Sequence, residues 1–201
     1  MQGSWLEQLK RNKNKLAISL VFLIIAIIAY SLAGDYVTDQ GNTVIAHDLI
    51  LDHVGPYNLS FIFVWLFILV IVVGLFYPLM FRPAKISYFL NIFSLFVIVR
   101  SGFIIFTHLR PPIDAIEPVF PSMLQFLNFT NDLFFSGHAG LPFLLFLLFY
   151  KENKKLAYFM LACSIILGIT VLLMHVHYSI DVFSAYFITY GVYKIGNKIF
   201  K

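Results

Sequence analysis

Two short segments carry the side chains best suited to chemistry, Ser136-Gly137-His138 and His177-Tyr178-Ser179-Ile180-Asp181. Each lies where a long apolar run ends, and we expect both ends at the same face of a membrane. An imidazole can attack phosphorus or transfer a proton, and a carboxylate beside it can orient the ring. Two histidines and an aspartate at one membrane face therefore indicate phosphoryl-transfer chemistry on a lipid.

His177 and Asp181 are four residues apart, so they share one face if a helix begins at or before His177. A carboxylate that accepts from one imidazole nitrogen fixes the tautomer and leaves the other nitrogen free to react. A pair that only seals a helix end is the alternative, and the spacing does not separate the two. His175 points elsewhere, and we expect it to be structural or interfacial.

The small residues around His138, namely Ser136, Gly137, Ala139 and Gly140, predict the start of a helix. Such a start offers unpaired backbone N–H groups and a positive dipole end to an anion, and small side chains let a phosphate approach closely. His138 is then placed to give a proton to a departing oxygen. An ordinary N-cap role for Ser136 is the alternative.

Arg100 interrupts an apolar run, where a guanidinium costs at least a few kcal/mol, so a counter-charge is expected. A substrate phosphate held bidentately, or a structural partner such as Asp132, would supply it. We favour the phosphate. Arg110 lies at the outer rim, where snorkelling is a sufficient explanation. The candidate substrate-binding residues are Arg100, Ser136, Gly137, Asp132 and Arg110.

The composition predicts which elements position these residues, because the chain is 60% hydrophobic and only 12% charged. A soluble domain has about 25% charged residues, so we predict an integral membrane protein. Stretches of about 20 apolar residues cross a bilayer as helices. The candidates are 16–34, 58–81, 86–107, 133–150, 156–174 and 178–198. We predict an all-α bundle of six transmembrane helices in a single domain over residues 1–201, with the first helix retained rather than cleaved as a signal peptide.

Basic residues predict the orientation, because short cytoplasmic segments carry an excess of Lys and Arg. Every Lys and Arg except Arg100 and Arg110 falls on one side of a six-helix topology. Both termini are therefore expected in the cytoplasm, with the histidine pair at the extracytoplasmic face of the cytoplasmic (plasma) membrane. The net charge of +4 indicates attraction to anionic headgroups, and no nucleic-acid partner is predicted.

Helix geometry places the candidate residues at one depth. At a rise of 1.5 Å per residue, Arg100, His138 and Asp181 each lie about 20 Å from the lysine that ends their own helix at the cytoplasmic side. Ionisable groups at such a depth usually mark a functional site. A small transporter with these residues along a polar path is an alternative of another class, but the sequence shows no repeat and no pair of broken helices.

The long non-cytoplasmic connections, 35–57 and 108–132, are expected to be functional because long loops in compact domains often are. The first contains four side chains of metal-ligand type, His47, Asp48, Asp52 and His53. Their spacing matches no compact metal pattern, so we interpret them as residues of the rim and of substrate entry. No metal and no cofactor is predicted.

Two of these segments resemble a known family. The stretch 131–138, Asn-Asp-Leu-Phe-Phe-Ser-Gly-His, followed by residues 177–181, is similar to the paired motifs of the sphingomyelin synthase family. That family belongs to the superfamily of type 2 phosphatidic acid phosphatases. Residues 48–52 with Pro56 bear a weaker likeness to the family's first outer-loop motif.

A third family stretch, arginine-threonine-leucine-proline, is similar to Arg100, Thr107, Leu109 and Pro112. Arg110 departs from the proline that is usual at its place in that stretch. The lysine-x6-arginine-proline motif of the lipid phosphate phosphatases is incomplete, because Phe103 occupies the lysine position. This departure favours the synthase-like branch over the phosphatase branch.

The resemblance implies a mechanism with phospholipid or sphingolipid substrates in the bilayer. His177, oriented by Asp181, attacks phosphorus and forms a phosphohistidine, while His138 protonates the leaving alkoxide and later deprotonates the acceptor. Arg100 and the backbone at Gly137 stabilise the developing charge. A lipid alcohol as acceptor gives a headgroup transferase, which we favour, and water gives a lipid phosphatase or a phospholipase C-like hydrolase.

Overall fold

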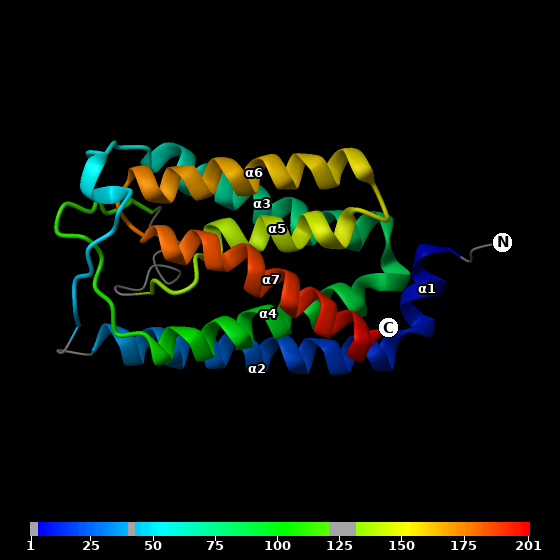
Figure 1. The fold of residues 1–201 in the computed structure, drawn as a ribbon. Helices are drawn as coiled ribbons and strands as arrows, with labels where there is room; N and C mark the ends of the chain where they lie inside the picture. Colours follow the sequence, from blue (N-terminus) through cyan, green and yellow to red (C-terminus); the bar gives the residue numbers. More distant parts are fainter. Residues whose placement is uncertain (1–3, 40–42, 121–131) are drawn as a thin grey trace.

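The computed structural model describes residues 4–39, 43–120 and 132–201. These residues form seven α-helices and two short 3-10 helices, and no strand. In chain order the elements are α1 (Trp5–Arg11), α2 (Lys13–Thr38), η1 (Leu51–His53), α3 (Ser60–Phe81), η2 (Pro83–Lys85), α4 (Ile86–Phe106), α5 (Gly137–Phe149), α6 (Lys154–Leu173) and α7 (Ser179–Phe200). The long helices run side by side, with the long loops at one end and both termini at the other (Figure 1). The all-α prediction is confirmed.

Four of the described helices are long and apolar enough to cross a membrane, within Lys13–Thr38, Ser60–Phe81, Pro83–Phe106 and Lys154–Leu173. The helix α5 is apolar but has only 13 residues, and α7 carries several polar and charged residues. The predicted count of six spans is therefore supported for four, and the orientation of the termini and the single domain stay predictions.

The predicted helix bounds differ from the observed ones by up to four residues, at the end of α2, which continues to Thr38 instead of 34, and at the start of α5, which begins at Gly137 instead of 133. Ser136 is its N-cap and accepts a hydrogen bond from the backbone N–H of Ala139 at 3.5 Å. Residues 132–135 are not helical. The extended chain brings Asp132 to α4, which a continuous helix would not do.

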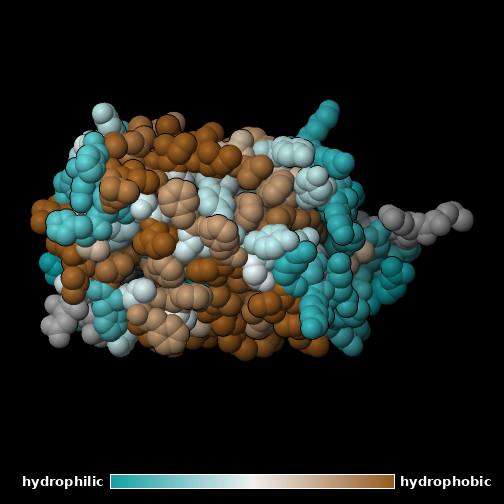
Figure 2. Space-filling view, in the orientation of Figure 1, coloured by the Kyte–Doolittle hydropathy of each residue, from teal (hydrophilic) through white to brown (hydrophobic). Residues whose placement is uncertain are grey.

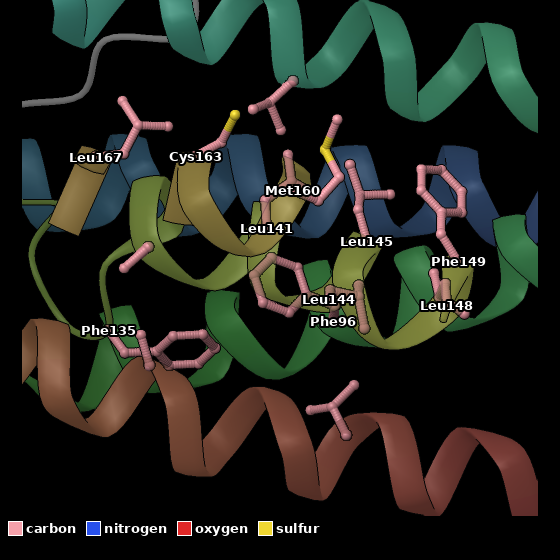
Figure 3. Packing of buried hydrophobic residues seen from close by; sticks show 14 of the residues in the cluster. Phe96, Phe135, Leu141, Leu144, Leu145, Leu148, Phe149, Met160, Cys163 and Leu167 are labelled. Carbon is pink, nitrogen blue, oxygen red and sulfur yellow. The ribbon is translucent and has the colours of Figure 1, made fainter. Parts of the chain in front are cut away.

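The helix α5 lies at the centre of the bundle and packs against α6 and α7 (Figure 3). Gly140 permits this close packing. A Cβ atom there would lie 3.0 Å from Thr189 Oγ1 and 3.1 Å from Phe96 Cζ. The hydroxyl of Ser164 also donates to the carbonyl of Ala139 at 2.7 Å, which ties α6 to the first turn of α5.

The helix α2 packs along α4 through a narrow face of mostly small residues, Ser19, Ala26, Ala33, Gly34 and Val37. Small residues let helices approach closely where no hydrophobic effect drives their association. Many of the other residues of α2 are exposed and apolar, as expected for a helix that faces lipid. A band of hydrophobic residues covers the middle of the molecule, with hydrophilic residues gathered at its two ends (Figure 2).

Candidate active site

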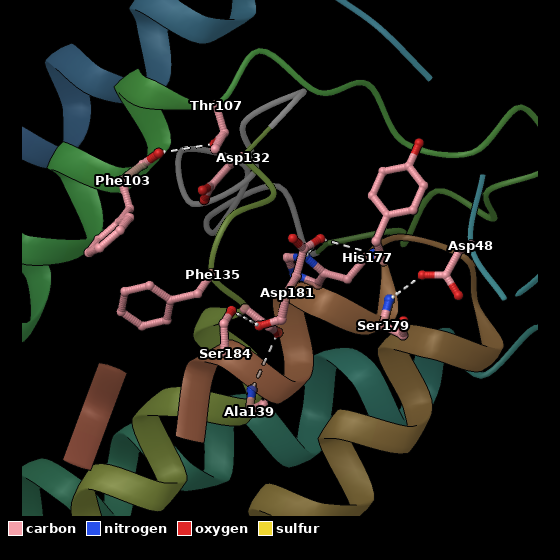
Figure 4. Close-up of polar contacts among 12 residues, drawn as sticks. Asp48, Phe103, Thr107, Asp132, Phe135, Ala139, His177, Ser179, Asp181 and Ser184 are labelled. Carbon is pink, nitrogen blue, oxygen red and sulfur yellow. Dashed lines mark hydrogen bonds and ion pairs between the residues drawn. The ribbon is translucent and has the colours of Figure 1, made fainter. Parts of the chain in front are cut away.

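The two segments singled out in the sequence meet in the structure. The backbone N–H of Ser136, just before α5, donates to the backbone carbonyl of Asp181 in the first turn of α7 at 3.1 Å. The hydroxyl of Ser184 donates to the same carbonyl at 3.2 Å. This backbone contact holds the entry of α5 against the entry of α7 at the loop end of the bundle (Figure 4).

His177 and Asp181 lie beside each other, with 3.4 Å between Nδ1 and Oδ2. The contact is within the range of an ion pair but lacks the geometry of a hydrogen bond. Asp181 is fully buried, and its Oδ2 also accepts from the backbone N–H of Tyr178 at 2.9 Å. Asp181 thus caps α7, and the same carboxylate faces the His177 imidazole.

His138 lies in the first turn of α5 between two aromatic rings of α3. The ring centroids of Phe63 and Phe67 are 3.9 and 4.0 Å from the imidazole centroid. Its Nε2 is buried and has no hydrogen-bond partner among the described residues. His138 interacts electrostatically with His177 and with Arg100. The structure therefore gathers the two histidines and the arginine in one apolar setting.

Arg100 on α4 makes a bidentate ion pair with Asp132. Nη2 lies 2.8 Å from Oδ1 and Nη1 lies 2.9 Å from Oδ2. Its Nε donates to the carbonyl of Phe135 at 2.9 Å, and a Cβ on Gly137 would lie 3.2 Å from Nε. Both partner side chains are about nine-tenths buried. Asp132 thus supplies the counter-charge expected for Arg100. Arg100 in turn holds the segment that leads into α5, through Asp132 and the Phe135 carbonyl.

Asp48, in the first outer loop, fastens that loop to the start of α7. Its Oδ2 accepts from the backbone N–H of Ser179 at 2.6 Å, and its Oδ1 accepts from those of Ile50 and Leu51 at 2.9 and 3.2 Å. Burial alone would raise the pKa of Asp48, but these three hydrogen bonds hold that pKa below its usual value. The sequence analysis placed Asp48 at the rim; the structure shows it capping the helix that carries Asp181 (Figure 4).

Arg110 lies at the rim of the site. Its Nε donates to Thr43 Oγ1 at 3.1 Å, and its carbonyl accepts from the hydroxyl of Tyr178 at 2.8 Å. The same hydroxyl accepts from the backbone N–H of Ala46 at 3.1 Å. Tyr178, beside His177, therefore joins both outer loops through backbone groups, and the Arg110 side chain contacts the first loop.

His175 has a left-handed backbone with a φ of 56°. Its Nδ1 lies 2.9 Å from Asp114 Oδ1, and this contact lowers the pKa of the half-exposed Asp114. The nearby Ile116 N–H donates to the carbonyl of Met174 at 2.9 Å. His175 thus fixes the second outer loop to the turn between α6 and α7, away from the His177–Asp181 pair.

The four metal-ligand types of the first loop do not converge. His47 Nδ1 lies 3.5 Å from Asp52 Oδ2 at the exposed surface, and the His53 ring contacts the carbonyl of Leu49 at 3.0 Å. Within residues 4–39, 43–120 and 132–201, no group of three or more His, Cys, Asp or Glu is arranged to hold a metal ion.

Three residues that contact the site were not among the residues expected from the sequence: Tyr30, Phe63 and Phe67. The Tyr30 hydroxyl donates to Asp132 Oδ2 at 2.7 Å. A signal for Tyr30 was present, because it follows Lys15 by the same fifteen residues that separate Arg100 from Lys85. No comparable signal marks Phe63 and Phe67 in a chain with 23 Phe residues.

Residues 130–198 match a family described as PAP2 superfamily C-terminal. The match supports a relationship of this part of the chain to the PAP2 superfamily. It includes Asp132, Ser136–His138, His177 and Asp181, and it leaves Arg100 outside; Asn131 and the rest of 121–131 lie outside the described residues. No curated protein and no solved structure showed a significant match to the chain. The superfamily supports a function of the lipid phosphatase or phosphotransferase type in a membrane.

Proposed function

We propose that this chain is a membrane-embedded lipid phosphotransferase that moves a phosphate-containing headgroup between lipids through a phosphohistidine at His177. The observation that carries the proposal is the hydrogen bond from Ser136 N–H to the Asp181 carbonyl at 3.1 Å. It joins the entries of α5 and α7, so that His138 and His177 serve one site. The superfamily match over residues 130–198 supports the same class of chemistry.

In the first step, the free nitrogen of His177 attacks phosphorus, and the bond from phosphorus to the lipid oxygen breaks. Protonated His138 gives its proton to the departing alkoxide. In the second step, neutral His138 takes the proton of the acceptor hydroxyl while its oxygen attacks the phosphohistidine. The bond from phosphorus to His177 breaks, and both histidines return to their starting states.

The groups around the two histidines stabilise the charges that form during the proposed reaction. Asp181 lies 3.4 Å from His177 Nδ1 and favours the cation that forms when the ring carries the phosphoryl group. The guanidinium of Arg100 and the backbone N–H groups at the start of α5 lie where charge grows on the phosphoryl oxygens. Phosphoryl transfer depends mainly on such positioning and electrostatic stabilisation.

The setting of His138 favours a lipid alcohol over water as acceptor. The rings of Phe63 and Phe67 pack against the imidazole ring of His138. A site that excludes water protects a reactive intermediate from hydrolysis. A phosphatase or phospholipase C-like activity is the second candidate, and the superfamily match supports this class of chemistry equally. We place the site at the extracytoplasmic face, because the lysine-rich segments lie at the opposite end of the bundle (Figure 1).

Thin-layer analysis of purified protein in detergent tests the proposal. Labelled phospholipid or phosphatidic acid is supplied with ceramide or diacylglycerol, and each reaction is repeated with His177→Ala and with the control Lys198→Ala, an exposed residue near the other end of α7. We expect a new labelled lipid with the parent and the control, none with His177→Ala, and an acid-labile phosphoenzyme only when His177 is present. Release of phosphate or phosphoalcohol alone would assign a hydrolase, and full activity of His177→Ala would refute the intermediate.

A further inference from the structure

Tyr30 is a polar contact of the site on α2, at the edge of the face with which this helix packs along α4. Its hydroxyl donates to Asp132 Oδ2 at 2.7 Å, and the Arg100 guanidinium carbon lies 5.6 Å from the centroid of its ring. Tyr30 packs against the buried cluster of Ala33, Val37 and Ile104. Its position on α2 is thereby fixed relative to α4, which carries Arg100.

Tyr30 and Arg100 also match in depth. Each follows a lysine at the opposite end of its helix by fifteen residues, which is about 22 Å of helix. The helices α2 and α4 run side by side along their length (Figure 1), and the 5.6 Å between the Arg100 guanidinium carbon and the Tyr30 ring centroid agrees with this common depth. The helix α2 lies outside residues 130–198, so this contact is not part of the superfamily match.

The charges of Arg100 and Asp132 explain what the Tyr30 hydroxyl contributes. Asp132 is an anion about nine-tenths buried, and its two oxygens face the two terminal nitrogens of Arg100. A third donor shares the charge of the carboxylate, which leaves more of the guanidinium charge to act on an anion at Gly137. It also fixes the carboxylate plane, and with it the guanidinium whose Nε holds the Phe135 carbonyl at 2.9 Å.

We propose that Tyr30 is a positioning residue that, through Asp132, orients Arg100 toward the start of α5, where charge develops on the transferred phosphoryl group. This inference rests on the proposed function. Tyr30 does not touch the substrate in this scheme. Its loss should therefore lower the rate of the chemical step and leave lipid binding almost unchanged.

The test compares Tyr30→Phe with Tyr36→Phe, the same chemical change on the same helix at an exposed residue whose ring centroid lies 5.7 Å from that of His108, with the two rings tilted. Initial rates are measured in mixed micelles over a range of the donor lipid that the parent uses, and unfolding temperatures are recorded for each variant. We expect kcat to fall about tenfold in Tyr30→Phe with KM changed less than twofold. Tyr36→Phe should match the parent.

A double-mutant cycle separates positioning from general stability. In an Asp132→Asn background the hydroxyl has lost its anion, so adding Tyr30→Phe should lower kcat by less than twofold further. An unchanged kcat in Tyr30→Phe, or equal losses with and without Asp132, would overturn the inference. A parent without turnover on any lipid would refute the proposed function itself, which is a different result from an active parent with an indifferent Tyr30→Phe.

Discussion

The two ends of the bundle each carry an ion pair between a helix and a loop, and they differ in burial. At the lysine end, defined by Arg82, Lys85 and Glu152, Glu152 accepts from Arg82 Nε at 2.7 Å and from Lys85 Nζ. The two cations are 40% and 52% exposed there, whereas Glu152 itself is only 11% exposed, so the two ends differ in the burial of their cations. At the other end, which carries His138 and His177 and is called the histidine end here, the side chains of Arg100 and Asp132 are only 9% and 10% exposed.

Exposed and buried ion pairs differ in what they contribute to a protein. Ion pairs with exposed partners contribute little to stability, and basic residues such as those of the lysine end are typical of cytoplasmic segments. A buried pair costs several kcal/mol of desolvation for each ion, which its attraction must offset. A buried pair retained beside the two histidines supports the proposal that the histidine end is the functional one.

Breaking the buried pair should have the largest effect. Asp132→Ala leaves the Arg100 charge uncompensated, and we expect a loss of about 3–5 kcal/mol in the free energy of unfolding. Denaturant or thermal unfolding in detergent measures it. Lipid phosphotransfer should be lost as well.

Removing both charges serves as the control for that experiment. The double variant Arg100→Met with Asp132→Leu replaces the pair by apolar side chains, so its stability should return to within about 1 kcal/mol of the parent, yet it should remain inactive. A stable and active double variant would contradict a role for Arg100 in the chemistry.

The hydrogen bonds of Asp48 should rank second. Asp48→Asn removes the charged acceptor of Ser179 N–H, and we expect a loss of about 1.5–3 kcal/mol, as for hydrogen bonds to charged groups. The folded pKa of Asp48 is depressed, so its stabilisation is present above the unfolded pKa of about 3.9 and is lost as the pH falls through the folded pKa. The stability difference between parent and variant should therefore shrink below about pH 4.

Melting temperatures in detergent between pH 3 and 7 check this prediction. Asp52→Asn, in the same loop and exposed, is the matched control and should follow the parent at every pH. A constant difference between the parent and Asp48→Asn across that range would show that the ionised carboxylate of Asp48 does not hold the loop.

The sequence predicted most of the helices, because long apolar runs determine them. It missed α1, whose seven residues are held at the bundle end by a hydrogen bond from Trp5 Nε1 to the Leu79 carbonyl at 2.8 Å. It started α5 at 133, because the apolar run continues through Leu133 to Phe135, whereas the chain there is used to carry Asp132 to Arg100. A contact between segments can override an apolar pattern.

The site was predictable where its residues are close in sequence, as for His177 and Asp181. It was not predictable where a side chain binds backbone atoms far along the chain, as Asp48 binds Ser179 N–H, because no residue type marks such a partner. Tyr30 shows the intermediate case. Its depth was available from residue counts, but its partner Asp132 lies in a segment whose path depends on tertiary structure.

The exposed pair should have the smallest effect and completes the comparison of the two ends. Glu152→Gln removes the charge that Arg82 and Lys85 share, and because both cations are well exposed we expect a loss of less than about 1 kcal/mol. The loss should shrink further in high salt, which screens exposed charges, whereas the effect of Asp132→Ala should persist. Unfolding of both variants in low and high salt measures the contrast. A Glu152→Gln loss as large and as salt-resistant as that of Asp132→Ala would mean that burial does not distinguish the two ends.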